Sequence, residues 1–188
     1  MPRNVLFVKK HSDTRVTNAF KDAIHYLRKT YDDINIIVEE STAHELVPDF
    51  QDLISFRAEE KALLAEKTDF VIALGGDGSI LHVSSLFDQH AVPPVLSFSM
   101  GTLGFLLPYD VRAFPEAVND VFHSRFSLAL RKRLCMGLWD SRPEQCLWLP
   151  GENSCRELHF MNEMVLHRGS DPHMTTMDAF VAVSYTHL

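Results

Sequence analysis

A glycine-rich turn between an apolar run and a helical pattern constrains this chain of 188 residues more than any other feature. The turn is Gly75-Gly76-Asp77-Gly78-Ser79, and it follows directly on the apolar residues 70–74. Apolar residues at 80, 81, 83, 86 and 87 then have helical spacing. Glycine has no Cβ, so it permits positive φ and lets backbone N–H groups approach a ligand. A strand, this turn and a helix N-terminus predict an anion site, because the helix dipole favours phosphate there.

Asp77 limits the kinds of reaction that this turn could support. Phosphate would repel Asp77 unless a metal ion or a reacting hydroxyl needs the carboxylate, so the turn suggests a site of phosphoryl transfer. The alternative is a tight loop between a strand and a helix, in which Asp77 is only a helix N-cap. The turn has neither the Lys-Ser/Thr ending of a P-loop nor the GxGxxG spacing of a dinucleotide-binding turn.

A second glycine pair follows another predicted strand. Gly101 and Gly104 come directly after the run at 94–98 and predict a second close approach of the backbone. Phe105 follows them and is suited to stacking on a planar ligand. The alternative is that Phe105 and Leu106 fill the hydrophobic core, as most large apolar side chains do.

A third polar feature interrupts an alternating run near residue 160. Leu158, Phe160, Met164 and Leu166 alternate as in a strand, and Asn162-Glu163 lies among them. An amide and an acid in the middle of an apolar strand need partners, and the hydroxyls of a ribose and the edge of an adenine would satisfy both. The alternative is that Asn162 completes a bulge and that Glu163 is solvated.

The order of patterns predicts an α/β fold. Strands are expected at 5–8, 34–38, 70–74 and 94–98, and helices at 16–29, in part of 41–68, at 80–87 and from Pro115 to about 122. Alternating strands and helices predict a mostly parallel, doubly wound sheet with its ligands beyond the carboxyl ends of the strands. Gly75–Gly78 lies at such an end.

The pattern changes near residue 127. A period of two runs from Leu128 to Leu138 and again over 158–166, Met177–Tyr185 is expected to be a further strand, and no helix is expected after about residue 123. We therefore expect an α/β domain at 1–126 and the beginning of an all-β domain at 127–188, which is unfinished because so few strands do not close a stable sheet.

Composition excludes several functions. A net charge of −7 argues against general nucleic-acid binding, and the cluster Arg131-Lys132-Arg133 favours a solvated face over an anion contact. No apolar run approaches the length of a membrane span. The three cysteines have no CxxC spacing and the histidines are dispersed, so we expect reduced thiols in an intracellular protein and no metal ligands.

Together these motifs resemble the NAD kinase family over about residues 4–180. The resemblance rests on Gly75–Ser79, on Gly101–Leu106 and on Asn162-Glu163 with the following Val-Leu-His-Arg-Gly, in this order and spacing. Val8-Lys9-Lys10-His11 with Val16-Thr17-Asn18, and the strand ending at Glu39, resemble the eukaryotic branch. The family implies a phosphofructokinase- and diacylglycerol-kinase-like fold.

The resemblance also implies the roles of the residues. Asp77 would act on the 2′-hydroxyl of the adenosine ribose of NAD, as general base or orienting acceptor. The substrates would be NAD and ATP, the latter with Mg²⁺ or another divalent cation. The protein would be cytoplasmic, or mitochondrial if a presequence lies upstream, and would assemble as a dimer or tetramer. The residues implied to bind the nucleotides are Gly75, Gly76, Gly78, Ser79, Gly101, Phe105, Asn162 and Glu163.

The family pattern is incomplete in this sequence. The Thr-Pro-Thr-Gly-Ser-Thr-Ala-Tyr segment that completes the nucleotide site in NAD kinases is absent, and the ending at 183–188 does not match the family. We therefore expect a C-terminally truncated sequence that is inactive by itself. A catalytically incomplete NAD-binding fragment remains an alternative. A lipid kinase of the diacylglycerol or sphingosine type is another alternative, although the Asn-Pro-x-Ser-Gly and Gly-Thr-Gly-Asn-Asp segments of that class are absent. A phosphofructokinase would need a glycine-rich loop within residues 1–30, and these residues contain no glycine.

Overall fold

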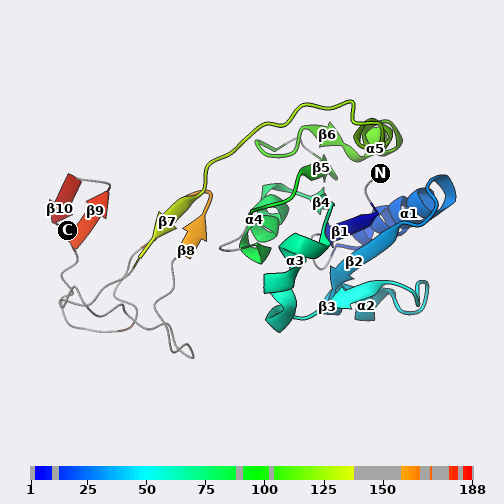
Figure 1. Cartoon of the computed structure of the whole chain (residues 1–188), viewed down its shortest axis with the longest axis horizontal. Coiled ribbons are helices and arrows are strands. Elements are labelled where there is room, and N and C mark those ends of the chain that lie inside the picture. Colours follow the sequence, from blue (N-terminus) through cyan, green and yellow to red (C-terminus); the bar gives the residue numbers. More distant parts are fainter. Residues whose placement is uncertain are drawn as a thin grey trace.

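In the computed structural model, a parallel sheet in the order β3-β2-β1-β4-β5-β6 lies among the helices α1–α5 of the N-terminal part of the chain (Figure 1). The structure describes residues 3–9, 13–87, 91–101, 104–137, 158–165, 170, 178–181 and 184–187. The strands are β1 (Asn4–Lys9), β2 (Asn35–Glu39), β3 (Ile54–Phe56), β4 (Phe70–Gly75), β5 (Val95–Ser99) and β6 (Tyr109–Asp110). All neighbouring strands in this sheet are parallel.

Helices cover both faces of the sheet. They are α1 (Thr14–Thr30), α2 (Glu40–Leu46), α3 (Lys61–Lys67), α4 (Asp77–Leu86) and α5 (Phe114–Phe122), with 3₁₀ turns η1 (Ala58–Glu60) and η2 (Val111–Ala113). One buried cluster joins α1, α2 and α5 to one face, and a second joins α3 and α4 to the other, as Figure 1 shows for α1, α5, α3 and α4. The predicted doubly wound α/β fold is therefore confirmed.

The strand order creates a natural ligand crevice. The order of connections reverses between β1 and β4, so the helices that follow these two strands lie on opposite faces and leave a crevice beyond their carboxyl ends. Lys9 ends β1 beside Leu74 of β4, and Gly75 is the last residue of β4. The glycine-rich turn therefore begins at the switch point.

Helix α1 shows how local sequence supports this arrangement. Asp13 is its N-cap, and the carboxylate accepts a hydrogen bond of 3.0 Å from the backbone N–H of Arg15. Val16, Phe20, Ala23, Ile24 and Leu27 are its buried residues, as their spacing predicted. Pro115 lies in the first turn of α5, which confirms the predicted start of that helix.

Two strands were not predicted. The segment 41–68, expected to be partly helical, contains α2 and α3 but also β3, and β6 has two residues. Short strands at a sheet edge carry too few residues to show a period of two.

The C-terminal segments form antiparallel pairs. β7 (Leu134–Met136) pairs with β8 (Leu158–Phe160), and β9 (Asp178–Val181) pairs with β10 (Ser184–His187). The expectation of one strand over 177–185 was wrong, because its residues divide between β9 and β10. Helices are absent from the described residues after 122, and the connector at 140–156, with Cys146 and Cys155, lies outside them.

The long strand expected from residue 128 was also wrong. Among the described residues of this segment, only Leu134–Met136 is paired, and residues 125–133 carry no helix or strand. Leu128 and Leu130 are 57% and 93% exposed, so the alternation does not bury one face here. Among the residues described, no helix combines the length and the apolar character that crossing a membrane requires.

The aromatic packing of β1 gives a test of this fold. Phe7 is 1% exposed, and its ring centroid lies 4.2 Å from that of Phe20 and 6.3 Å from that of Phe114. Phe7→Ala should lower the free energy of unfolding by about 3–5 kcal/mol, because it leaves a cavity between α1, α5 and the sheet. Leu63→Ala, at a side chain that is 48% exposed, is the control, and urea denaturation measures both. Equal urea midpoints for the two variants would contradict the packing.

Candidate functional site

The glycine-rich turn connects β4 to α4 through an unusual backbone conformation. Gly75 has φ of 152°, which a residue with a Cβ rarely adopts, and its carbonyl accepts a hydrogen bond of 3.3 Å from the N–H of Met100 after β5. Gly76 is the N-cap of α4, and Asp77 is the first residue of the helix. The alternative in which Asp77 serves as the N-cap is therefore wrong.

The carboxylate of Asp77 binds the second glycine motif. Its Oδ2 accepts a hydrogen bond of 3.0 Å from the N–H of Phe105, and its Oδ1 accepts one of 2.9 Å from the N–H of Leu106. The carbonyl oxygen of Leu106 in turn accepts a bond of 3.1 Å from the hydroxyl of Ser97 on β5. Two motifs far apart in sequence are thus joined by one acid.

Gly104 makes this contact possible. A Cβ built on Gly104 would lie 2.2 Å from Oδ1 of Asp77 and 2.7 Å from its Cγ, which is far inside contact distance. A Cβ on Gly76, Gly78 or Gly101 would meet nothing within 4 Å. Among these glycines, Gly104 is the one that the observed packing requires.

A pocket of about 520 Å³ lies against this acid, within the usual range for small-molecule sites. Four segments meet there: the start of α4, the loop after β5, the extended segment before β7 and the turn after β8. Its lining residues are Asp77, Leu81, Phe105, Leu106, Leu130, Arg131, Lys132, Met161 and Asn162.

Three of the predicted site residues, Asp77, Phe105 and Asn162, meet in this pocket. Phe105 is 94% exposed, so the alternative that it fills the core is wrong, whereas Leu106 does pack against the second core cluster. Asn162 and Glu163 follow the end of β8, so the expectation that they lie in the middle of a strand, bulged or regular, was wrong. Glu163 is exposed and is not among the residues that line the pocket.

The other predicted residues lie around the pocket. Gly76, Gly78 and Gly101 are exposed, and Ser79 is 6% exposed in the first turn of α4, where its N–H donates to the carbonyl of Gly76 at 2.8 Å. None of these residues, nor Gly75, is among those that line the pocket in the described chain. Thr102 and Leu103 of the second motif, and Leu166–Gly169 of the third, lie outside the described residues.

Part of the pocket wall was not predicted from the sequence. Arg131 and Lys132 were expected on a solvated face, and they remain exposed, but they form part of the pocket wall. The cluster of basic residues at 131–133 was the signal that could have identified them. Leu81, Leu130 and Met161 gave no signal, because apolar residues at such positions are usual in a core.

A buried cation lies at the adjacent strand end. Lys9 is 2% exposed, and its Nζ lies 2.7 Å from Oε2 of Glu45 on α2. Oε1 of Glu45 also accepts a hydrogen bond of 2.9 Å from the hydroxyl of Thr17 on α1. A buried ammonium requires such a partner, so this ion pair fixes α2 against the end of β1.

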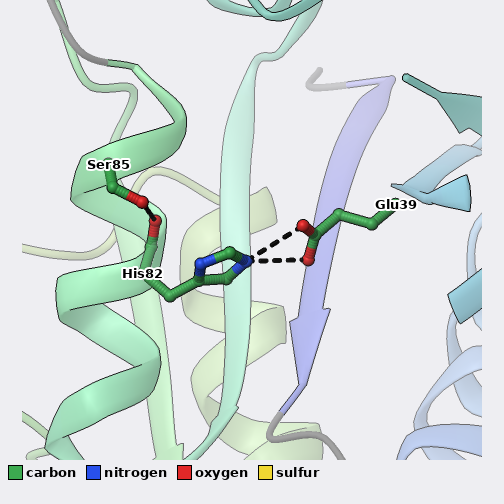
Figure 2. Close-up of polar contacts among 3 residues, drawn as sticks. All are labelled: Glu39, His82 and Ser85. Atoms are coloured by element: carbon green, nitrogen blue, oxygen red, sulfur yellow. Dashed lines mark hydrogen bonds and ion pairs between the residues drawn. The ribbon is translucent and has the colours of Figure 1, made fainter. Parts of the chain in front are cut away.

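A second polar contact holds the helix that carries Asp77. Figure 2 shows the ring of His82 on α4 reaching toward Glu39, the last residue of β2, and its Nε2 lies 2.9 and 3.0 Å from the two carboxylate oxygens. The hydroxyl of Ser85 donates to the carbonyl oxygen of His82 at 2.8 Å. The described residues contain no cluster of three or more His, Cys, Asp or Glu side chains that could hold a metal ion.

The contact at Gly104 can be tested directly. We expect Gly104→Ala to displace the loop from Asp77 and to destabilise the fold by about 1.5–3 kcal/mol for each charged hydrogen bond lost. Gly101→Ala adds the same methyl group where nothing lies within 4 Å and should change stability by less than about 0.5 kcal/mol. Urea denaturation compares the two, and equal stabilities would contradict the packing.

The contact between Glu39 and His82 can be tested by a double-mutant cycle. The variants Glu39→Ala, His82→Ala and the double variant should reveal a coupling of about 0.5–1 kcal/mol, discounted for partial exposure. Asp110 and Arg112, whose arginine side chain is 88% exposed, form a comparison pair that should couple more weakly. Additive effects at Glu39 and His82 would show that the contact does not hold α4.

Comparison with known proteins identifies relatives of this arrangement. A profile of the ATP-NAD kinase N-terminal domain matches residues 5–126. The mitochondrial NADH kinase of Schizosaccharomyces pombe is 39% identical over 180 residues, which cover 96% of this chain and 43% of that protein. The mitochondrial NADH kinase of Saccharomyces cerevisiae is 34% identical over 187 residues, covering 95% of this chain and 43% of that protein.

A solved structure agrees with these matches. The crystal structure of yeast NADH kinase complexed with NADH is similar with a TM-score of 0.78 and 33% identity, over 99% of this chain and 55% of that chain. The chain thus spans less than half the length of the two curated kinases, at 43% of each. Because the family profile covers more than half of its residues, this chain belongs to the ATP-NAD kinase family.

Proposed function

We propose that the protein phosphorylates NAD or NADH, transferring the γ-phosphoryl group of ATP to the 2′-hydroxyl of the adenosine ribose. The observation that carries this proposal is the carboxylate of Asp77, which is fixed by two backbone N–H groups at the start of α4 and lines a pocket of suitable size. The similarity to two NADH kinases, and to a kinase structure complexed with NADH, supports a dinucleotide as the acceptor.

The proposed reaction assigns a proton acceptor to Asp77. The ribose oxygen forms a bond to the γ-phosphorus, the bond from that phosphorus to the bridging oxygen of ADP breaks, and the hydroxyl proton passes to the carboxylate. Each carboxylate oxygen has two lone pairs and uses one for a backbone N–H, so one remains on each for the hydroxyl. Because both oxygens are fixed, the carboxylate needs little reorganisation to accept the proton.

The pocket is compatible with ATP carrying Mg²⁺. Among the described residues that line the pocket, Asp77 is the one with a carboxylate, and Mg²⁺ is commonly held by one or two carboxylates together with phosphate oxygens and water. The bound cation would supply charge neutralisation at the transferring phosphoryl group.

The remaining lining residues suit a dinucleotide. Leu81, Leu106, Leu130 and Met161 offer apolar surface, and the amide of Asn162 can donate and accept hydrogen bonds. The exposed ring of Phe105 is available to stack on a base. We propose that the backbone of Gly75, Gly76, Gly78 and Gly101 contacts the phosphates or the ribose. We propose that Ser79 and Glu163 also help to bind the nucleotides.

The cellular location, the domain boundaries and the oligomeric state are also proposals. Two relatives are named as mitochondrial, which supports a mitochondrial location as an alternative to the cytoplasmic one expected from sequence. The division into 1–126 and 127–188, and assembly as a dimer or tetramer, are likewise predictions.

The role of Asp77 can be tested in the protein expressed from its complete reading frame. Asp77→Asn should lower kcat for NADP or NADPH formation by about 10²–10⁴-fold, because an amide does not accept the hydroxyl proton. The measurement is the rate with ATP and either dinucleotide, together with the circular dichroism spectrum of each variant.

Asp69→Asn is the matched control. Oδ2 of Asp69 also accepts two backbone N–H groups, from Arg3 at 2.7 Å and Asn4 at 2.8 Å, but Asp69 precedes the N-terminal end of β4, whereas Asp77 follows its C-terminal end. This variant should keep its turnover. A folded Asp77→Asn variant with the turnover of Asp69→Asn would overturn the assignment.

A further inference from the structure

Two cations share the pocket with the proposed catalytic acid. Arg131 and Lys132 line it together with Asp77 and Asn162, although the extended segment 125–133 belongs to no sheet. Two weak contacts hold this segment against α4 and the neighbouring loop. Nη2 of Arg131 donates to the carbonyl oxygen of Phe105 at 3.4 Å, and Nη1 of Arg133 donates to that of Ser84 at 3.5 Å.

Within the described part of the chain, no carboxylate forms an ion pair with either of these cations. The ion pairs found among the described residues include neither Arg131 nor Lys132, and none joins either cation to Asp77. Asp77 satisfies its oxygens with backbone N–H groups instead. The guanidinium of Arg131 therefore keeps most of its five donors for another acceptor.

The pocket thus has a local charge opposite to that of the whole chain. The chain carries a net charge of −7, yet the described residues that line the pocket present two side-chain cations and one carboxylate. The N-terminal end of α4 adds positive potential at the same place. An anion bound there would gain charge-assisted hydrogen bonds from arginine, in bidentate geometry, and a point charge from lysine.

We propose that Arg131 and Lys132 bind the phosphate chain of a nucleotide substrate and hold it beside Asp77. This inference rests on the proposed function, because it assigns binding groups to the same site. The phosphate chain is either the triphosphate of ATP or the pyrophosphate of NAD(H), and both are polyanions that the two cations would neutralise. Because these side chains act on binding, their removal should raise a KM and leave kcat nearly unchanged.

The test compares charge removal inside and outside the pocket, in the protein expressed from its complete reading frame. Arg131→Gln and Lys132→Gln should each raise the KM for one nucleotide about tenfold, with kcat within about threefold of the wild-type value. An increase confined to ATP assigns the triphosphate, and one confined to NAD or NADH assigns the pyrophosphate. Arg131→Lys, which keeps the charge, should recover part of the affinity.

The double variant Lys29→Gln/Lys67→Gln is the matched control, because it removes two positive charges at the ends of α1 and α3. It should leave both KM values unchanged. The inference is overturned if the pocket variants keep wild-type KM values for both nucleotides, or if the control double variant raises them equally.

A binding measurement separates this inference from the proposed function. If the wild-type protein forms no NADP or NADPH, the proposed function fails, and calorimetry with inorganic tripolyphosphate then tests the phosphate-binding role alone. Weaker binding of tripolyphosphate by Arg131→Gln and Lys132→Gln than by the control supports the role. Equal binding by all variants refutes it.

Discussion

The site depends on one interaction, the pair of hydrogen bonds from the backbone of Phe105 and Leu106 to the carboxylate of Asp77. It links the turn after β4 to the loop after β5, and it requires Gly104 to have no side chain, since a Cβ there would lie 2.2 Å from the carboxylate. Charged hydrogen bonds of this kind are stronger than neutral ones. They fix the acid and leave one lone pair on each oxygen for chemistry.

The sheet places this interaction where a ligand can reach it. The reversal of strand order between β1 and β4 opens a crevice at their carboxyl ends, and α4 begins there. Buried apolar residues of α4 fix the helix on the sheet, and the contact of His82 with Glu39 adds a polar restraint across it (Figure 2). The same elements that form the core therefore determine the position of Asp77.

Much of this could be predicted from local patterns. Helical spacing predicted α1, and the glycines before α4 predicted a turn that permits positive φ, which Gly75 adopts at 152°. The partners of Asp77 lie 28 and 29 residues away, so no local pattern could reveal them. The alternation after residue 127 predicted a long strand, but only Leu134–Met136 is paired among the described residues. The pattern could not show that Leu130 is 93% exposed or that Arg131 lines the pocket. Those outcomes depend on packing between distant segments.

A crystal structure of the full-length protein with NADH would show where the adenosine ribose lies relative to Asp77. We expect the 2′-oxygen of the adenosine ribose to lie about 2.6–3.2 Å from a carboxylate oxygen of Asp77, while the N–H groups of Phe105 and Leu106 still donate to that carboxylate. A ribose bound away from the pocket, or a carboxylate that leaves the loop when the dinucleotide binds, would contradict it.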